Sequence, residues 1–304
     1  MALTSNPARP FGSVLTAMVT PMTSDGDVDL EAARTLATWL VDHGCDGLVL
    51  NGTTGEAPTT HAPEKADLVA AVVDAVGDRA AVLAGAGSND TLHAARMAEQ
   101  AAEAGADGLL VVSPYYSRPS QEGLARHMEA VAEAGGKPVM LYDVPARAGV
   151  RIAADTYARL AQHPLIVATK DATGDVAAAA GLAARTGLAW YSGDDALLLP
   201  FLAHGGAGVV SVAAHAVPDA FAQVITAWDA GDTARALKAF RTTLPAIAAL
   251  NGAGFQAVMA KAAVEALGVV TGRAVRMPLV AASDDEAAAV RAGLVDAGVL
   301  AVTS

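Results

Sequence analysis

The sequence predicts an α/β fold, a (β/α)8 TIM barrel followed by a C-terminal helical extension. Longer alanine-rich stretches, typical of helices, alternate with eight short apolar runs at residues 13–19, 47–51, 81–85, 108–113, 138–144, 166–170, 189–192 and 208–212. Most of these runs are continuously apolar. That pattern is typical of parallel strands covered by helices on one face and packed inside a barrel on the other. Eight such units predict closure into a barrel.

Short glycine-containing segments support one repeated unit. They stand directly before or at the start of three of the runs, at 43–47, 104–108 and 204–208. Each combines a helix-ending glycine with the start of a strand. We therefore expect the same helix-to-strand connection to recur around the barrel.

The C-terminal part has a different pattern. No run of comparable strength follows residue 212, and 218–250, 255–267 and 284–297 are typical of helices. No proline- or serine-rich linker precedes this part. We expect a barrel over 1–217 that carries the active site, and a helical extension over 218–304 packed on it.

Composition excludes several classes of function. Hydrophobic residues make up 53% and charged ones 17% of the 304 residues, which suits a large core. The net charge of -12 opposes nucleic-acid binding, because phosphate contacts need a clustered basic face. The apolar runs are too short for a membrane span of about 20 residues. Residues 1–10 contain no apolar signal core, so we expect a cytoplasmic protein.

Lys170 is the most informative single residue. It closes the apolar stretch 165–169, whereas the other four lysines fall in helical or polar segments. Functional groups of such barrels collect at the C-terminal strand ends. Burial there lowers the pKa of an amine and prepares it to attack a ketone. The alternative is an ion pair with a carboxylate such as Asp171, and the position alone leaves both interpretations open.

The segment Gly-Thr-Thr-Gly-Glu at 52–56 follows the second run. Its hydroxyls, Thr53 and Thr54, and its backbone amides at a glycine-containing turn suit a bound carboxylate. The alternative is an ordinary turn that caps the next helix, with Glu56 as a cap residue.

Two further polar residues mark the fifth run. Tyr142 lies within it. If its side chain faces the interior, its hydroxyl needs a hydrogen-bond partner, which Thr53 could supply. As a phenol near a lysine, Tyr142 is suited to proton transfer; the alternative is a core tyrosine. Arg147 follows in a turn that can aim its guanidinium at a substrate carboxylate. The alternative is that Arg147 forms a surface ion pair.

Six ordered motifs make the sequence similar to a known family. It resembles the dihydrodipicolinate synthase / N-acetylneuraminate lyase family, nearly end to end, and within it the synthase branch of actinobacteria. The motifs stand at 15–21 (Leu-Thr-Ala-Met-Val-Thr-Pro), 52–56, 112–116 (Val-Ser-Pro-Tyr-Tyr), 142–147 (Tyr-Asp-Val-Pro-Ala-Arg), 170–174 (Lys-Asp-Ala-Thr-Gly) and 192–195 (Ser-Gly-Asp-Asp).

The resemblance implies a set of catalytic residues and a quaternary structure. Lys170 would form an imine with pyruvate, Tyr142 would act as acid and base, and Thr53 and Tyr116 would complete a proton relay. In such enzymes the residue matching Tyr116 reaches in from the neighbouring subunit. The resemblance therefore implies a tight dimer, and commonly a homotetramer of two dimers.

It also implies substrate-binding residues. Thr54 would hold the pyruvate carboxylate, Gly193 and Val210 would line the pyruvate site through their backbone, and Arg147 would grip the carboxylate of the aldehyde.

The implied reaction is a class I aldolase-type condensation. Pyruvate would combine with L-aspartate 4-semialdehyde to give 4-hydroxy-tetrahydrodipicolinate, in the biosynthesis of diaminopimelate and lysine, with no cofactor and no metal. One alternative is a lyase of the same family acting on N-acetylneuraminate or a 2-keto-3-deoxy sugar acid, and Arg147 favours the synthase. Another is a relative that binds a keto acid without turning it over. A metal-dependent aldolase is disfavoured, because the seven histidines are scattered.

Three departures from the family pattern have expected consequences. Asp143 stands where many members have Asn, and residues 255–261 replace a usual Pro-Ile-Pro-Val-Lys segment; we expect neither to touch the chemistry. His93 stands where lysine-inhibited members tend to carry Glu, although Asn89 and Tyr115 match that site. We therefore expect no strong inhibition by lysine.

Overall fold

A computed structural model describes residues 6, 8–252 and 254–301. The predicted ranges 1–217 and 218–304, and the segment 1–10 considered for an export signal, each include residues outside the described part.

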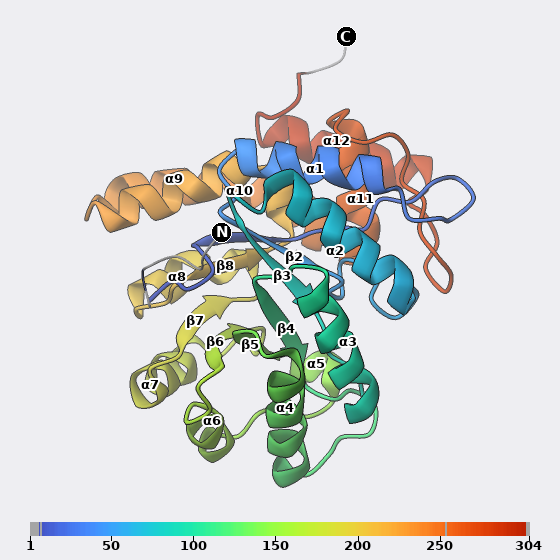
Figure 1. Cartoon of the computed structure of the whole chain (residues 1–304). Coiled ribbons are helices and arrows are strands. Elements are labelled where there is room, and N and C mark those ends of the chain that lie inside the picture. Colours follow the sequence, from blue (N-terminus) through green and yellow to red (C-terminus); the bar gives the residue numbers. More distant parts are fainter. Residues whose placement is uncertain (1–5, 7, 253, 302–304) are drawn as a thin grey trace.

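Eight parallel strands form a closed barrel in sequence order (Figure 1). The last strand pairs with the first, Leu15 lying beside Val210 in register, so the sheet has no free edge. The strands are β1 (Val14–Ala17), β2 (Gly47–Leu50), β3 (Ala81–Gly85), β4 (Gly108–Val112), β5 (Val139–Asp143), β6 (Ile166–Asp171), β7 (Ala189–Ser192) and β8 (Gly208–Ser211). All eight predicted strands are confirmed, and β6 runs one residue beyond its predicted run.

Two apolar layers hold the barrel together. Side chains inside it, among them Phe11, Leu110 and Tyr191, form one buried cluster. A larger cluster lies between the outer faces of the strands and the helices. Because each strand is buried on both faces, its sequence is continuously apolar, which is the pattern that predicted it.

Helices between the strands cover the barrel from outside (Figure 1). Asp29, Asp90, Ser120 and Asp175 cap the N-termini of four of them, each accepting a hydrogen bond from a backbone N–H of the first turn. The helices are α1 (Leu30–Asp42), α2 (Ala62–Val76), α3 (Thr91–Glu103), α4 (Gln121–Gly135), α5 (Pro145–Ala148), α6 (Ala154–Leu160), α7 (Val176–Thr186) and α8 (Leu198–Ala203), with a 3-10 turn η1 (Asp195–Leu197) before α8.

The described residues of the C-terminal part form four helices where three were expected. They are α9 (Pro218–Asp229), α10 (Thr233–Asn251), α11 (Gln256–Ala266) and α12 (Asp284–Asp296), after the 3-10 turn η2 (Ala213–His215). The single helix predicted over 218–250 is wrong. Gly231 adopts a positive φ of 75° that ends α9, and Asp232 caps α10 through the backbone N–H of Arg235.

The C-terminal helices lie together on one side of the barrel (orange to red in Figure 1). Helix α9 also contacts β1 directly, so the extension begins in close contact with the sheet. We keep the division of the chain at residue 217 as a proposal.

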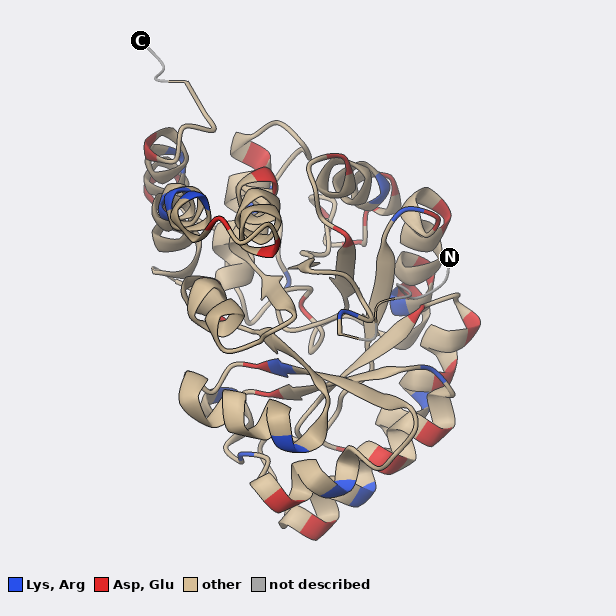
Figure 2. Ribbon diagram, turned by 90° about the vertical axis from the view of Figure 1, so that its left-hand side faces the viewer, with Lys and Arg blue, Asp and Glu red and all other residues tan. Residues whose placement is uncertain are grey.

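Charged residues lie mainly on the outer helices. In the face shown in Figure 2, acidic and basic residues are interspersed. Within the described part of the chain no single helix is long and apolar enough to cross a membrane; only α10 and α11 taken together, at an angle of 117°, meet the length and composition required.

Candidate active site

Lys170 stands near the C-terminal end of β6. In register it pairs with Tyr142 of β5 and with Tyr191 of β7. Its side chain is 6% exposed, and its Nζ lies 4.5 Å from the centroid of the Tyr142 ring. The amine therefore lies over an aromatic face at the strand end where barrel proteins place their reacting groups.

Burial prepares this amine for nucleophilic attack. It lowers the pKa of Lys170 to about 8, against the opposing effect of the Asp195 charge and with the help of the Arg147 charge. With that pKa, about 9% of the amine is unprotonated at pH 7, compared with about 0.03% for an ordinary lysine. The neutral amine, which can add to a ketone, is thus about 300 times more abundant.

The alternative of a lysine paired with Asp171 is wrong. Over the described residues no carboxylate lies within ion-pair distance of Lys170 Nζ. The oxygens of Asp171 instead accept hydrogen bonds from Trp190 Nε1 at 2.9 Å and from the backbone N–H of Thr173 at 2.8 Å. Asp171 thus fixes the strand ends and leaves the amine free.

Tyr142 lies beside Lys170 and also lines an open cavity. Burial raises the pKa of Tyr142, while the charge of Arg147 and a hydrogen bond with Thr53 lower it in part. The phenol is therefore protonated at neutral pH and has an adjacent hydroxyl to exchange its proton with. That is what proton transfer at this position requires.

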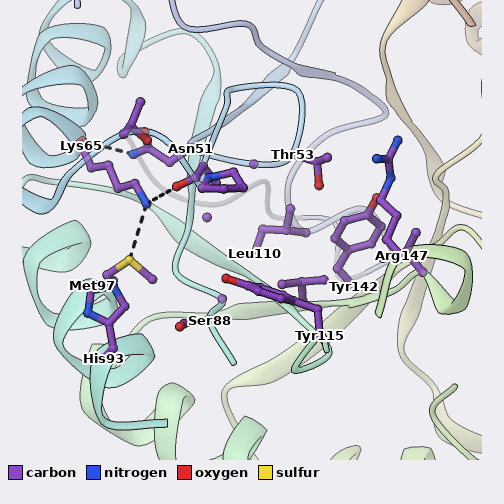
Figure 3. A pocket seen from close by; sticks show the side chains of 18 of the residues that line it. Asn51, Thr53, Lys65, Ser88, His93, Met97, Leu110, Tyr115, Tyr142 and Arg147 are labelled. Atoms are coloured by element: carbon purple, nitrogen blue, oxygen red, sulfur yellow. Dashed lines mark hydrogen bonds between the residues drawn. The ribbon is translucent and has the colours of Figure 1, made fainter. Parts of the chain in front are cut away.

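A cavity of about 530 Å³ opens in front of Tyr142. Thr53, Tyr142 and Arg147 gather at one end, and Lys65, His93 and Met97 lie at the other (Figure 3). No Asp or Glu is among its described lining residues. A cavity lined by basic and hydroxyl groups suits small substrates that carry carboxylates.

Arg147 is held by the C-terminal part of the chain. It is exposed, its guanidinium lies 5.1 Å from the centre of the Phe255 ring, and its Nη2 donates to Gln256 Oε1 at 3.3 Å. It forms no ion pair with any described residue, so the surface ion-pair alternative is wrong. The segment 255–261, which we expected not to touch the chemistry, thus contacts Arg147, and its Phe255 also lines the cavity.

The turn 52–56 is anchored by its last residue. Thr54 is buried, and Thr53 is half-buried beside Tyr142. Glu56 does not cap the following helix, because the N-terminus of α2 is capped by His61 and Glu64. Its buried carboxylate instead accepts from Lys261 Nζ at 2.5 Å and from the backbone N–H of Arg276 at 2.9 Å.

The three other predicted residues lie in different surroundings. Gly193 follows β7, and its N–H donates to the Asp171 carbonyl at 2.7 Å; a Cβ there would come within 2.9 Å of that oxygen. Val210 belongs to the same interior cluster as Tyr142. Tyr116 is not among the described residues that line the cavity of its own chain; it is 90% exposed and has a positive φ of 71°.

Asp195 is a site residue that sequence reasoning missed. It is buried, and it accepts from the backbone N–H of Ala213 at 2.9 Å and from Asn251 Nδ2 at 2.7 Å. Its charge raises the pKa of Lys170 against burial. The signal was an acidic residue three positions beyond a barrel strand, inside a motif already noted.

Lys65 is a second lysine with a lowered pKa, caused by burial, and it lines the cavity. Its Nζ donates to the Ala57 carbonyl at 2.9 Å and contacts Met97 Sδ at 3.7 Å. Figure 3 places it at the end of the cavity away from Tyr142. Lys65 therefore lies away from Tyr142, the phenol over which the Lys170 amine lies.

In the described part of the chain no three His, Cys, Asp or Glu side chains gather in a way that could hold a metal ion.

Comparison with known proteins agrees with this geometry. A family model described as the dihydrodipicolinate synthetase family matches residues 10–297. The 4-hydroxy-tetrahydrodipicolinate synthase of Bifidobacterium animalis subsp. lactis is 53% identical over 291 residues, which are 96% of this chain and 95% of that protein. Relatives of this similarity include many from actinobacteria, as expected.

Solved structures agree as well. The dihydrodipicolinate synthase of Cyanidioschyzon merolae, solved with lysine bound, superposes with a TM-score of 0.91 at 38% identity, covering 95% of this chain and 99% of that one. The chloride-inhibited dihydrodipicolinate synthase of Acinetobacter baumannii, solved with pyruvate, gives 0.90 at 36% identity with coverage of 95% and 99%. Fold, strand-end residues and relatives agree: this chain belongs to the dihydrodipicolinate synthetase family.

Proposed function

We propose that this protein is a lyase that condenses pyruvate with L-aspartate 4-semialdehyde through a Schiff base on Lys170, giving 4-hydroxy-tetrahydrodipicolinate for the biosynthesis of diaminopimelate and lysine. The observation that carries the proposal is the Lys170 amine. Burial lowers its pKa to about 8, and it lies over the Tyr142 ring with no carboxylate of the described residues within ion-pair distance. The names of relatives about half identical over most of the chain support the same reaction.

The first half of the reaction uses the amine and the phenol. The Lys170 amine adds to C2 of pyruvate, and loss of water gives the imine. Removal of a proton from C3 gives an enamine. Tyr142, hydrogen-bonded to Thr53, would move these protons, and general acid–base catalysis of this kind contributes about 10²–10⁴-fold in rate. Thr54 would hold the carboxylate of pyruvate, with Gly193 and Val210 lining the site.

The second half uses the aldehyde. C3 of the enamine attacks the aldehyde carbon, and the oxygen takes a proton from Tyr142. Arg147, which has no acidic partner in the part of the chain that the structure describes, would hold the carboxylate of the semialdehyde. The amine of this substrate then displaces Lys170 and closes the ring, which regenerates the enzyme without a cofactor.

The proton relay would be completed by a second subunit. Tyr116 is 90% exposed and held in a left-handed conformation, which suits a side chain that enters a neighbour's cavity. We propose a tight dimer as the catalytic unit, two dimers in a homotetramer, and a cytoplasmic location.

The aldehyde is the part of the proposal that needs the sharpest test. Purified protein is incubated with pyruvate and, separately, aspartate semialdehyde, N-acetylmannosamine or glyceraldehyde, and each product is followed directly. Turnover of aspartate semialdehyde by the wild type would support the proposal if Arg147→Ala loses this turnover and does not use the other two aldehydes any better than the wild type does. Turnover only with a polyol aldehyde would replace the substrate. No turnover with any of them, despite pyruvate binding, would favour a non-catalytic relative.

A further inference from the structure

Glu56 and Lys261 form a buried ion pair between residues 205 positions apart. Their side chains are 0% and 3% exposed, respectively, and Lys261 Nζ lies 2.5 Å from Glu56 Oε1. Lys261 also donates to the carbonyl of Ala274 at 2.6 Å. Burial lowers the pKa of Lys261, and the charge and the hydrogen bond of Glu56 oppose that effect. Such a pair is costly to break from one side, because the remaining charge stays buried.

The pair is directly connected to the turn that carries Thr53. The backbone N–H of Glu56 donates to the carbonyl of Thr53 at 3.2 Å. The carbonyl of Glu56 accepts from the hydroxyls of Thr59 and Thr60, at 3.1 and 3.3 Å. Glu56 itself has a positive φ of 58°, a strained conformation for this residue type that persists only where its surroundings hold it.

The other side of the pair belongs to the C-terminal extension. Lys261 lies in α11, and Glu56 Oε2 accepts from the backbone N–H of Arg276, beyond that helix. The side chain of Arg276 in turn donates to the Thr59 carbonyl at 2.8 Å and pairs with Glu64. Segment 52–60, which includes turn 52–56, is therefore held by charges and backbone groups that come from outside the barrel strands. We call these contacts of the segment with Lys261 and Arg276 the clamp.

We propose that Glu56 and Lys261 are positioning residues for the reaction, which hold Thr53 in place by anchoring turn 52–56 to the C-terminal extension. This inference rests on the proposed function for its kinetic consequence. Glu56 acts through the backbone of Thr53, whose hydroxyl is the partner of Tyr142. A displacement of about 1 Å at such a site costs on the order of 100-fold in rate.

A kinetic double-mutant cycle tests the proposal. Glu56→Gln is expected to lower kcat about 10- to 100-fold in the wild-type background, because Thr53 loses its position. In a Thr53→Val background, where the hydroxyl is already absent, the same substitution should change kcat by less than about 2-fold. If the two losses multiply, Glu56 does not act through Thr53 and the proposal is overturned.

Arg273→Met is the matched control. Arg273 also ties the C-terminal segment together, through Glu265 and Asp284 at 2.6 Å each, but it has no hydrogen bond or ion pair to the turn among the described residues. This variant should lose stability while keeping kcat measured below its melting temperature. If Glu56→Gln does not fold, Glu56→Gln/Lys261→Met, which leaves no unpaired buried charge, takes its place in the cycle. An unchanged kcat in that variant would also overturn the proposal.

Amide hydrogen exchange separates this inference from the proposed function. The N–H groups of residues 52–60 should exchange faster in Glu56→Gln than in Arg273→Met, whatever the substrate of the enzyme. Equal protection of the turn in both variants would refute the clamp even if the condensation is confirmed. Faster exchange in a protein that never turns over pyruvate would keep the clamp and remove only its role in catalysis.

Discussion

Asp143→Asn should remove a steep pH dependence of stability. Asp143 closes β5 beside Tyr142, pairs in register with Asp171 and is 1% exposed. Burial raises its pKa to about 7; the charge of Asp171 raises it too, while the N–H of Ile152, the hydroxyl of Tyr157 and the charge of Arg151 lower it. Its Oδ1 has no hydrogen-bond partner among the described residues. The folded protein therefore holds a proton on Asp143 near neutral pH.

The expected size follows from the two pKa values. In the unfolded chain the pKa of this carboxyl is about 3.9, so between pH 4 and 7 the folded state binds one more proton than the unfolded state. The free energy of unfolding then falls as pH rises, by about 1.4 kcal/mol per pH unit, and levels off above the folded pKa. From about pH 5 to about pH 8 the loss is about 3 kcal/mol, or roughly 100-fold in the unfolding constant. The amide of the Asp143→Asn variant resembles the protonated acid and does not titrate.

Urea unfolding of both proteins measures this difference. The wild type and Asp143→Asn are compared at equal protein concentration, near pH 5 and near pH 8, because the stability of an oligomer depends on concentration. The wild type should lose about 3 kcal/mol more than the variant across this interval. A difference between the two proteins that stays the same at both pH values would show that Asp143 does not titrate there, and the account of its burial would be wrong.

Three further predictions concern the site. Tyr142→Phe should lower kcat by about 10²–10⁴-fold in the condensation assay, because the proton donor is gone, and near wild-type turnover would exclude Tyr142 from proton transfer. Phe255→Ala should raise KM for aspartate semialdehyde about 2- to 5-fold and leave KM for pyruvate nearly unchanged, since a partly exposed cation–π contact contributes about 0.5–1 kcal/mol to holding Arg147. Lysine added to the assay should inhibit only weakly, because the amine of lysine needs an acidic partner, whereas the described lining residues of the cavity include Lys65 and His93 and no Asp or Glu. Strong inhibition at low lysine concentration would contradict this.

The barrel could be predicted because its signals are local. Each strand is an apolar run bounded by turn residues, and closure follows from counting the runs. The strand-end position of Lys170 and the Thr53–Tyr142 neighbourhood followed from the same geometry, since strands of a barrel end at one mouth. The break between α9 and α10 was missed because Gly231 is one glycine in a long alanine-rich pattern, and a single glycine costs a helix only about 1 kcal/mol.

Contacts between distant segments could not be predicted in this way. Glu56 and Lys261 are each unremarkable in sequence, and their pairing depends on how α11 packs on the barrel. The contact of Phe255 with Arg147 has the same origin. Periodicity assigns a helix to a face but does not say which residue of another element it meets there.

The lysine that reacts with pyruvate tests the account most directly. The protein is reduced with borohydride in the presence of pyruvate, digested, and the modified peptide is identified by mass spectrometry. We predict a single adduct on Lys170 that forms faster as pH rises through about 8, as its lowered pKa requires, and that is absent from Lys170→Ala. An adduct on Lys65, the other lysine near the cavity with a lowered pKa, or one that persists in Lys170→Ala, would contradict the account.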